Sequence, residues 1–155
     1  KLRAAMPSIT LRTTVITGFP GESEAEFKEL LSFVGEMKFH RLGVFTYSRE
    51  EGTPAAEMPE QIDEELKILR KDKVMSLQKD ISAEKCEAFV GKDMTVIVEG
   101  WLAQDSVYCA RSYRDAPDID GLVFVSSDEE LLTGDFVRGH ITKASDYDLY
   151  GSVTE

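Results

Sequence analysis

The sequence predicts two structural classes in one chain: an α/β segment over residues 1–88 and an all-β barrel over residues 89–155. First, a β-type run, a glycine-rich turn and an amphipathic helix follow one another early in the chain. Second, short runs of strand composition dominate the later part. Third, the net charge differs between the α/β segment and the barrel segment. Residues 1–88 hold 13 Lys and Arg against 16 Asp and Glu, whereas residues 89–155 hold 5 against 13, a net charge of −8.

The α/β segment starts with Lys1–Met6, which is typical of the last turns of a helix stopped by Pro7. The chain does not begin with methionine and contains no apolar run typical of a signal peptide or a membrane span, so we expect neither. We therefore expect a C-terminal piece of a larger cytoplasmic protein.

A strand over 12–17 leads into the turn Gly18-Phe-Pro-Gly21 and then into a helix over about 24–37. Ser23 and Glu26 have the spacing of a capping box, which fixes the start of that helix. A second strand over 41–47 should pair in parallel with the first through a right-handed crossover. Ligands of such units bind beyond the carboxyl ends of the strands, so the turn is a candidate site. An ordinary β–α corner without a ligand is the alternative.

The loop over 48–61 contains Gly52, Pro54 and Pro59 and is expected to be irregular. Asp63 is the expected cap of a long helix that reaches residue 88. One apolar stripe is predicted along this helix, formed by Leu66, Leu69, Val74, Leu77 and Ile81.

Five candidate strands make up the second segment, at 94–99, 107–111, 121–125, 136–142 and 149–153. Turn residues separate them every 8–14 residues. Five short strands in a chain of this size favour a closed barrel of OB-like type, because an open sheet would leave unprotected edges.

The composition disfavours several kinds of chemistry. No histidines and cysteines have the spacing of a metal site, and Cys86 and Cys109 are expected to be free thiols. Affinity for nucleic acids comes largely from Lys and Arg, so the acidic barrel is a poor RNA-binding candidate. A basic protein is the better expected partner, with acidity for solubility alone as the alternative.

Several motifs carry a resemblance to a known family. Thr14-x-Ile16-x-Gly18-Phe-Pro-Gly-Glu22, Phe45-Thr-Tyr-Ser48 and Glu51-Gly-Thr-Pro-Ala55 are similar to the C-terminal third of radical-SAM methylthiotransferases. The barrel motifs Asp115-Ala-Pro-x-Ile-Asp-Gly121 and Asp146-Tyr-Asp-Leu-Tyr-Gly151 resemble the TRAM domain of that family, more narrowly its RimO type. The resemblance covers essentially the whole chain.

The resemblance implies a fold. Residues 1–88 would hold the last two β/α units of a radical-SAM barrel, which is a partial TIM-type barrel. Residues 89–155 would be the five-stranded TRAM barrel.

The resemblance also implies site residues and partners. The adenosyl part of S-adenosylmethionine would contact Ile16, Gly18, Glu22, Phe45 and Tyr47. A basic small-subunit ribosomal protein would meet the acidic TRAM barrel, with candidate contacts at Asp115, Asp118, Asp120, Asp146 and Asp148. We expect no membrane association, and self-association of the chain through the cut edge of its barrel.

Enzymes of this type methylthiolate the β-carbon of an aspartate in a ribosomal protein, using S-adenosylmethionine and two [4Fe–4S] clusters. The chain contains no CxxxCxxC motif for such a cluster, so it is expected to be inactive alone. Two alternatives remain: an enzyme of the same superfamily that methylthiolates an adenosine in transfer RNA, and a non-catalytic acidic TRAM adaptor. If Gly18 lines the adenosyl pocket, valine at this position is expected to exclude the ligand while leaving the fold mostly intact.

Overall fold

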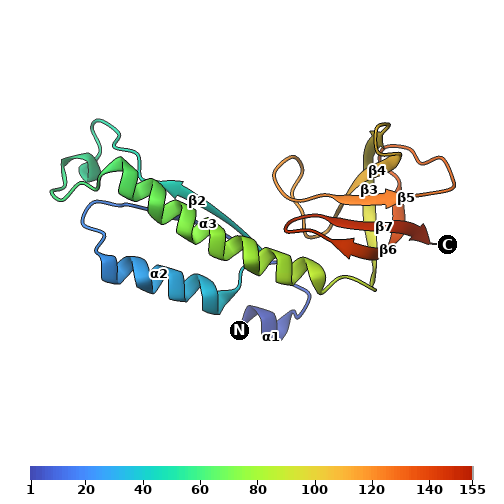
Figure 1. Ribbon diagram of the computed structural model, residues 1–155, viewed down its shortest axis with the longest axis horizontal. Coiled ribbons are helices and arrows are strands. Elements are labelled where there is room, and N and C mark those ends of the chain that lie inside the picture. Colours follow the sequence, from blue (N-terminus) through green and yellow to red (C-terminus); the bar gives the residue numbers. More distant parts are fainter. Residues whose placement is uncertain (155) are drawn as a thin grey trace. The chain divides into compact units, whose positions relative to one another are not determined.

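The computed structural model describes residues 1–154 (Figure 1). Internal contacts divide the chain into two compact units, Lys1–Ile81 and the residues from Ser82 onward. The expected domain boundary at residue 89 falls inside the second unit by this measure, and it stays a prediction. Among residues 1–154, no helix combines the length and the apolar character needed to span a membrane.

The first unit is built on two parallel strands, β1 (Arg12–Thr17) and β2 (Arg41–Thr46). The short α1 (Leu2–Ala5) precedes them. Between them lies α2 (Glu24–Met37), which starts at Ser23 with the predicted capping box. In the pairing, Ile16 stands opposite Phe45. The strand–turn–helix–strand unit thus forms as the sequence pattern predicts.

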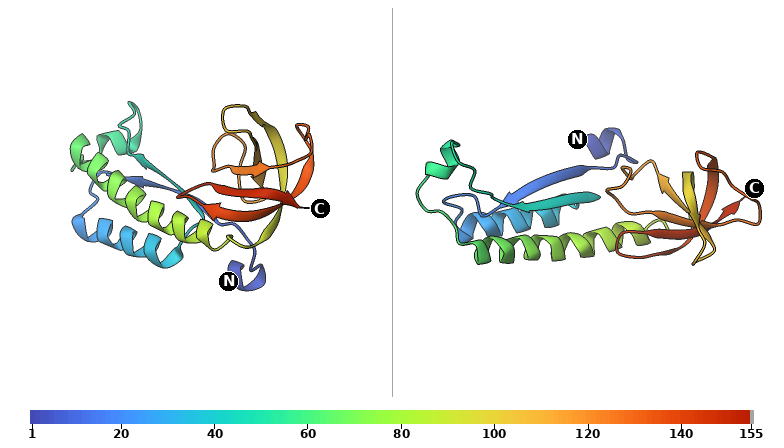
Figure 2. Two further views of the ribbon diagram at one scale, coloured as in Figure 1. Left: turned by 45° about the vertical axis from the view of Figure 1, so that its right-hand side comes forward. Right: turned by 90° about the horizontal axis from the view of Figure 1, so that it is seen from above.

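Both long helices cover the same face of this small sheet (Figure 2). The core between them and the sheet is apolar and contains Phe27, Val34, Phe39, Leu42, Val44, Val74 and Ile81. On the other face of the sheet, Ile16 is 55% exposed and Phe45 is 62% exposed. Because side chains alternate along a strand, one face is buried and the other is open.

The long helix α3 (Glu64–Glu87) forms as expected, but its predicted apolar stripe is wrong in its first half. Leu66 and Leu69 are exposed, whereas Lys67, Arg70 and Gln78 are buried. These three polar side chains donate to backbone carbonyls of the first unit, at Tyr47, Glu22 and Phe39. Burial of these groups is tolerated because each finds an acceptor.

The sequence predicts an irregular loop over 48–61, and this prediction is wrong for four of its residues. The loop contains the single 3₁₀ turn η1 (Pro54–Glu57). The Thr53 side chain accepts from Ala56 N at its start, and proline at the first position suits a helix start.

The second unit is a closed five-stranded barrel in the order β3-β4-β5-β7-β6, as predicted for an OB-like fold. Its strands are β3 (Asp93–Leu102), β4 (Val107–Ser112), β5 (Val123–Ser126), β6 (Phe136–Ala144) and β7 (Leu149–Thr154). The pair β5–β7 is parallel, and every other pair is antiparallel.

The barrel interior is filled by side chains from all five strands and by Cys86 from the last turn of α3. The fully buried members are Cys86, Val96, Val98, Ala110, Val123, Val125, Ile141 and Leu149. Cys86 and Cys109 are both free thiols, as predicted. Burial raises the pKa of the Cys109 thiol, and the carboxylates of Glu99 and Asp148 raise it further.

Candidate functional site

The turn after β1 is held by a buried ion pair. The Glu22 carboxylate accepts from Gly18 N at 3.0 Å and binds Arg70 Nη1 at 2.6 Å. The same Arg70 nitrogen donates to the Glu22 carbonyl at 2.9 Å. Both side chains are largely buried, at 4% exposure for Arg70 and 12% for Glu22. Glu22 therefore closes the turn on itself and on α3.

Gly18 has a φ of +73°, the left-handed region that favours glycine. A Cβ at this position would run into the Lys67 side chain of α3. The expectation that valine here leaves the fold intact is therefore wrong. The space beside Gly18 is occupied by protein atoms, and glycine is required by the turn itself.

Tyr47 lies just beyond β2, where its N–H donates to the Thr17 carbonyl at 2.9 Å. Its ring packs edge-on against Phe19, with centroids 5.3 Å apart, and beneath the Lys67 ammonium group. The ring is buried, and its hydroxyl has no hydrogen-bond partner among residues 1–154. A polar group brought from outside this chain would satisfy that hydroxyl.

The five residues of the expected adenosyl site therefore fall into two groups. Ile16 and Phe45 are paired across the strands and exposed on the open face of the sheet. Gly18, Glu22 and Tyr47 are engaged in the turn and its support. The first group exposes apolar surface, and the second group fixes the turn and the strand ends beside it.

The two acidic barrel motifs meet in space. Asp148 Oδ1 accepts from Leu122 N at 2.9 Å, next to the parallel pairing of β5 with β7. A Cβ on Gly121 would run into the Tyr147 carbonyl, so the close approach of the two loops requires glycine there. The two motifs therefore form one contact region, here called the loop joint, beside the β5–β7 pairing that closes the barrel.

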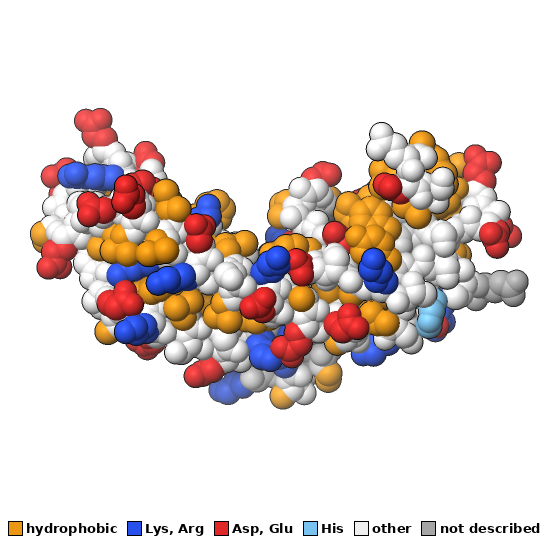
Figure 3. Space-filling view, viewed as in Figure 1, with side chains coloured by type: hydrophobic (Ala, Val, Ile, Leu, Met, Phe, Trp, Pro, Cys, Tyr) orange, Lys and Arg blue, Asp and Glu red, His pale blue; other side chains and the backbone are white. Residues whose placement is uncertain are grey.

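Most of the expected substrate-contact aspartates serve this loop structure. Asp115 is buried and accepts from Ser112 Oγ at 2.7 Å, while Asp120 Oδ2 accepts from Ala116 N at 2.7 Å. Asp118 is exposed, with a φ of +60°, and Asp146 is half-buried. Figure 3 shows acidic side chains scattered over the visible face of the barrel rather than gathered in one patch.

No group of three or more His, Cys, Asp or Glu side chains that could hold a metal ion occurs within residues 1–154. His140 Nδ1 contacts Asp93 Oδ1 at 2.7 Å, and His40 Nδ1 accepts from Leu11 N. Each histidine thus has a structural partner within the described residues.

Comparison with known proteins shows which family model and which proteins the chain is similar to. A TRAM domain family model matches residues 90–154. The chain is 48% identical, over 98% of its length, to the ribosomal protein uS12 methylthiotransferase RimO of Lachnoclostridium phytofermentans. It is 55% identical, over 97% of its length, to RimO of Pelotomaculum thermopropionicum. The chain spans 34% of the length of each of these relatives. The chain therefore matches the C-terminal part of RimO-type radical-SAM methylthiotransferases, and this part includes a TRAM domain.

Proposed function

We propose that the intact protein methylthiolates the β-carbon of an aspartate in a small-subunit ribosomal protein in the cytoplasm. The observation that carries this proposal is the identity of 48% and 55% to two RimO proteins across nearly the whole chain. Both relatives are named for ribosomal protein uS12 as their substrate. This chain alone is proposed to be inactive, because it has no motif that could hold a cluster.

S-adenosylmethionine would be held partly by the open face of the β1–β2 sheet. The exposed side chains of Ile16 and Phe45 fit a flat apolar group such as adenine, since they would exclude water from its faces. Within the described part of the chain, residues 1–154, the buried Tyr47 hydroxyl has no hydrogen-bond partner. Gly18 and Glu22 would act by fixing the turn. The cofactor would supply radical and methyl-transfer chemistry together with two [4Fe–4S] clusters, which residues outside this chain would hold.

The TRAM barrel is proposed to recruit the ribosomal protein through its negative field. A net charge of −8 over residues 89–155 attracts a basic protein and repels RNA. This argues against an adenosine in transfer RNA as the substrate. Asp118 is the contact that we retain, because it is exposed, whereas the carboxylates of Asp115, Asp120 and Asp148 accept hydrogen bonds within the loops.

The adenosyl site can be tested in the full-length protein with Phe45→Ala. We expect weaker S-adenosylmethionine binding by calorimetry and less methylthiolated ribosomal protein by mass spectrometry. Ile68→Ala is the matched control, since Ile68 is also an exposed apolar residue, at 47%, but lies on α3. Equal affinity of Phe45→Ala and Ile68→Ala would contradict the proposed adenosyl contact. Methylthiolation of transfer RNA in place of the protein would contradict the proposed substrate.

A further inference from the structure

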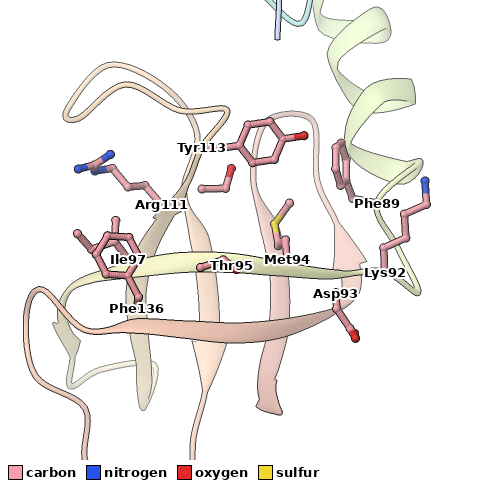
Figure 4. A pocket seen from close by; sticks show the side chains of 10 residues that line it. Phe89, Lys92, Asp93, Met94, Thr95, Ile97, Arg111, Tyr113 and Phe136 are labelled. Carbon is pink, nitrogen blue, oxygen red and sulfur yellow. The ribbon is translucent and has the colours of Figure 1, made fainter. Parts of the chain in front are cut away.

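A groove of about 480 Å³ lies on the outside of the TRAM barrel (Figure 4). Its floor is the first half of β3, with Thr95 at the centre. Phe89, Tyr113 and Phe136 stand around it. None of the acidic residues expected to contact the substrate lines this groove.

The groove exists because β4 does not pair with the first three residues of β3. Pairing of β3 with β4 begins at Val96 opposite Ser112, whereas pairing of β3 with β6 begins at Asp93. At Ser112 the chain turns, since Ser112 Oγ donates to Asp115 and Arg114 N donates back to Ser112 Oγ. Residues 93–95 of β3 therefore have a neighbouring strand on one side only. Such a short strand edge can pair with an extended peptide.

The sides of the groove expose large apolar surface. Phe136 is 74% exposed and Tyr113 is 64% exposed. Ile97 lies between β4 and β6 in the register, opposite Arg111 on one side and Phe136 on the other. Aromatic surface around a concave site is typical of peptide-binding grooves, because burying it on binding is favourable.

The charges of the groove are almost balanced. Arg111 pairs with Glu99 at 2.7 Å, and Arg138 pairs with Asp93 at 3.2 Å. Lys92 has no carboxylate partner among residues 1–154, and its ammonium group lies 5.7 Å from the Phe89 ring centroid. The groove therefore offers one uncompensated positive charge on a unit that is otherwise strongly acidic.

This charge pattern distinguishes between two classes of occupant. RNA binding requires several cations that neutralise phosphates, and the surrounding negative field would repel a polyanion. A peptide with a single carboxylate needs only one cation, and its apolar side chains would use the aromatic walls. The groove fits the peptide.

We propose that this groove binds an extended protein segment that pairs with the Asp93–Thr95 edge, places large apolar side chains against Tyr113 and Phe136, and sets one carboxylate against Lys92. The proposal is independent of the proposed activity, because it concerns a different surface and requires neither cofactor nor clusters.

The test uses the full-length protein and a fluorescein-labelled peptide, acetyl-Thr-Phe-Thr-Leu-Thr-Asp-amide, with anisotropy as the readout. Phe136→Ser should weaken binding about tenfold, as expected for loss of an apolar anchor. Lys92→Glu should weaken binding of this peptide several-fold but leave binding of the same peptide ending in Asn almost unchanged. Methylating alternate backbone nitrogens of the peptide should abolish binding, since strand pairing needs those donors.

Two matched controls are available on the same barrel unit. Leu132→Ser removes an apolar side chain that is 66% exposed outside the groove, and Lys143→Glu reverses a lysine on β6 that does not line it. Both should bind the peptide like the parent chain. Four results would overturn the proposal: no saturable binding of the peptide, unchanged affinity in Phe136→Ser, equal binding of the methylated peptide, or tighter binding of hexauridylate in competition.

Discussion

The β1–α2 turn and the loop joint of the barrel both depend on carboxylates, but they use them in different ways. At the turn, Glu22 is buried against the guanidinium group of Arg70 and also accepts from the backbone. In the barrel, Asp120 and Asp148 accept from the backbone N–H groups of Ala116 and Leu122. The turn therefore includes an ion pair to α3, whereas the loop joint includes carboxylate-to-backbone hydrogen bonds within and between its loops.

This difference teaches that acidic residues at a candidate site need not face a ligand. A buried ion pair is costly to break, because the remaining charge is left without compensation. A carboxylate that accepts from one backbone N–H contributes less, about 1–2 kcal/mol. The two regions should therefore respond differently to substitution.

The largest effect is expected from Gly18→Val. The positive φ and the contact with Lys67 should together cost about 3 kcal/mol of unfolding free energy, measured by urea denaturation of the chain. Gly52→Val separates the two causes, since Gly52 also has a positive φ, of +78°, but nothing within 4 Å of its Cβ position. If the two variants lose equal stability, the contact with Lys67 contributes nothing.

An intermediate effect is expected at the loop joint. Asp148→Ala leaves Leu122 N without its acceptor and should cost about 1.5 kcal/mol by the same measurement. Asp118→Asn is the control, because Asp118 is exposed and asparagine tolerates its positive φ. Similar losses in both variants would show that the loop hydrogen bond does not distinguish the two aspartates.

The smallest effect concerns Asp93 on the barrel surface. The contact with His140 lowers the pKa of Asp93, and Arg138 lowers it further. Because the pKa is lower in the folded than in the unfolded state, the contact stabilises the fold above the ordinary carboxyl pKa. This contribution is lost as the pH falls through the lowered folded value.

Asp93→Asn should therefore be less stable than the parent chain at neutral pH, and the difference should shrink in acid. Thermal midpoints of both chains across the acid range measure this difference. A difference that stays constant with pH would contradict the assignment. Added salt should reduce it at neutral pH, because the pair is exposed.

The elements that the sequence predicts well are those with local causes. The capping box at Ser23, the parallel pairing of β1 with β2 and the five barrel strands all follow from spacing and alternation within a few residues. The inward face of α3 could not be predicted in this way. Lys67 and Arg70 are buried because distant carbonyls accept from them, and periodicity assigns such residues to the solvent side.

The position of the candidate site stays a prediction, and the contacts made by its residues could not be predicted from the sequence. The resemblance directs attention to the turn and to the acidic loops, yet an aspartate that accepts from a backbone N–H looks the same in sequence as an exposed one. The three-residue spacing of Ser112 with Asp115, and of Ser145 with Asp148, is the available signal for loop-forming aspartates. The same Ser112–Asp115 spacing could have indicated where β4 ends and the groove begins.

The parallel pairing of β5 with β7 also has a consequence for the order of folding. The hairpin β3–β4 and the pair β4–β5 can form from neighbouring segments of chain, whereas Val123 must wait for Leu149, its partner in β7. Closing the loop between Val123 and Leu149 costs chain entropy, and this cost comes before the β5–β7 contacts can stabilise the barrel. We therefore expect this pairing to form late. During synthesis, the barrel cannot close until β7 has left the ribosome. Until then the interior faces of β3 and β5 remain exposed to water and to other chains.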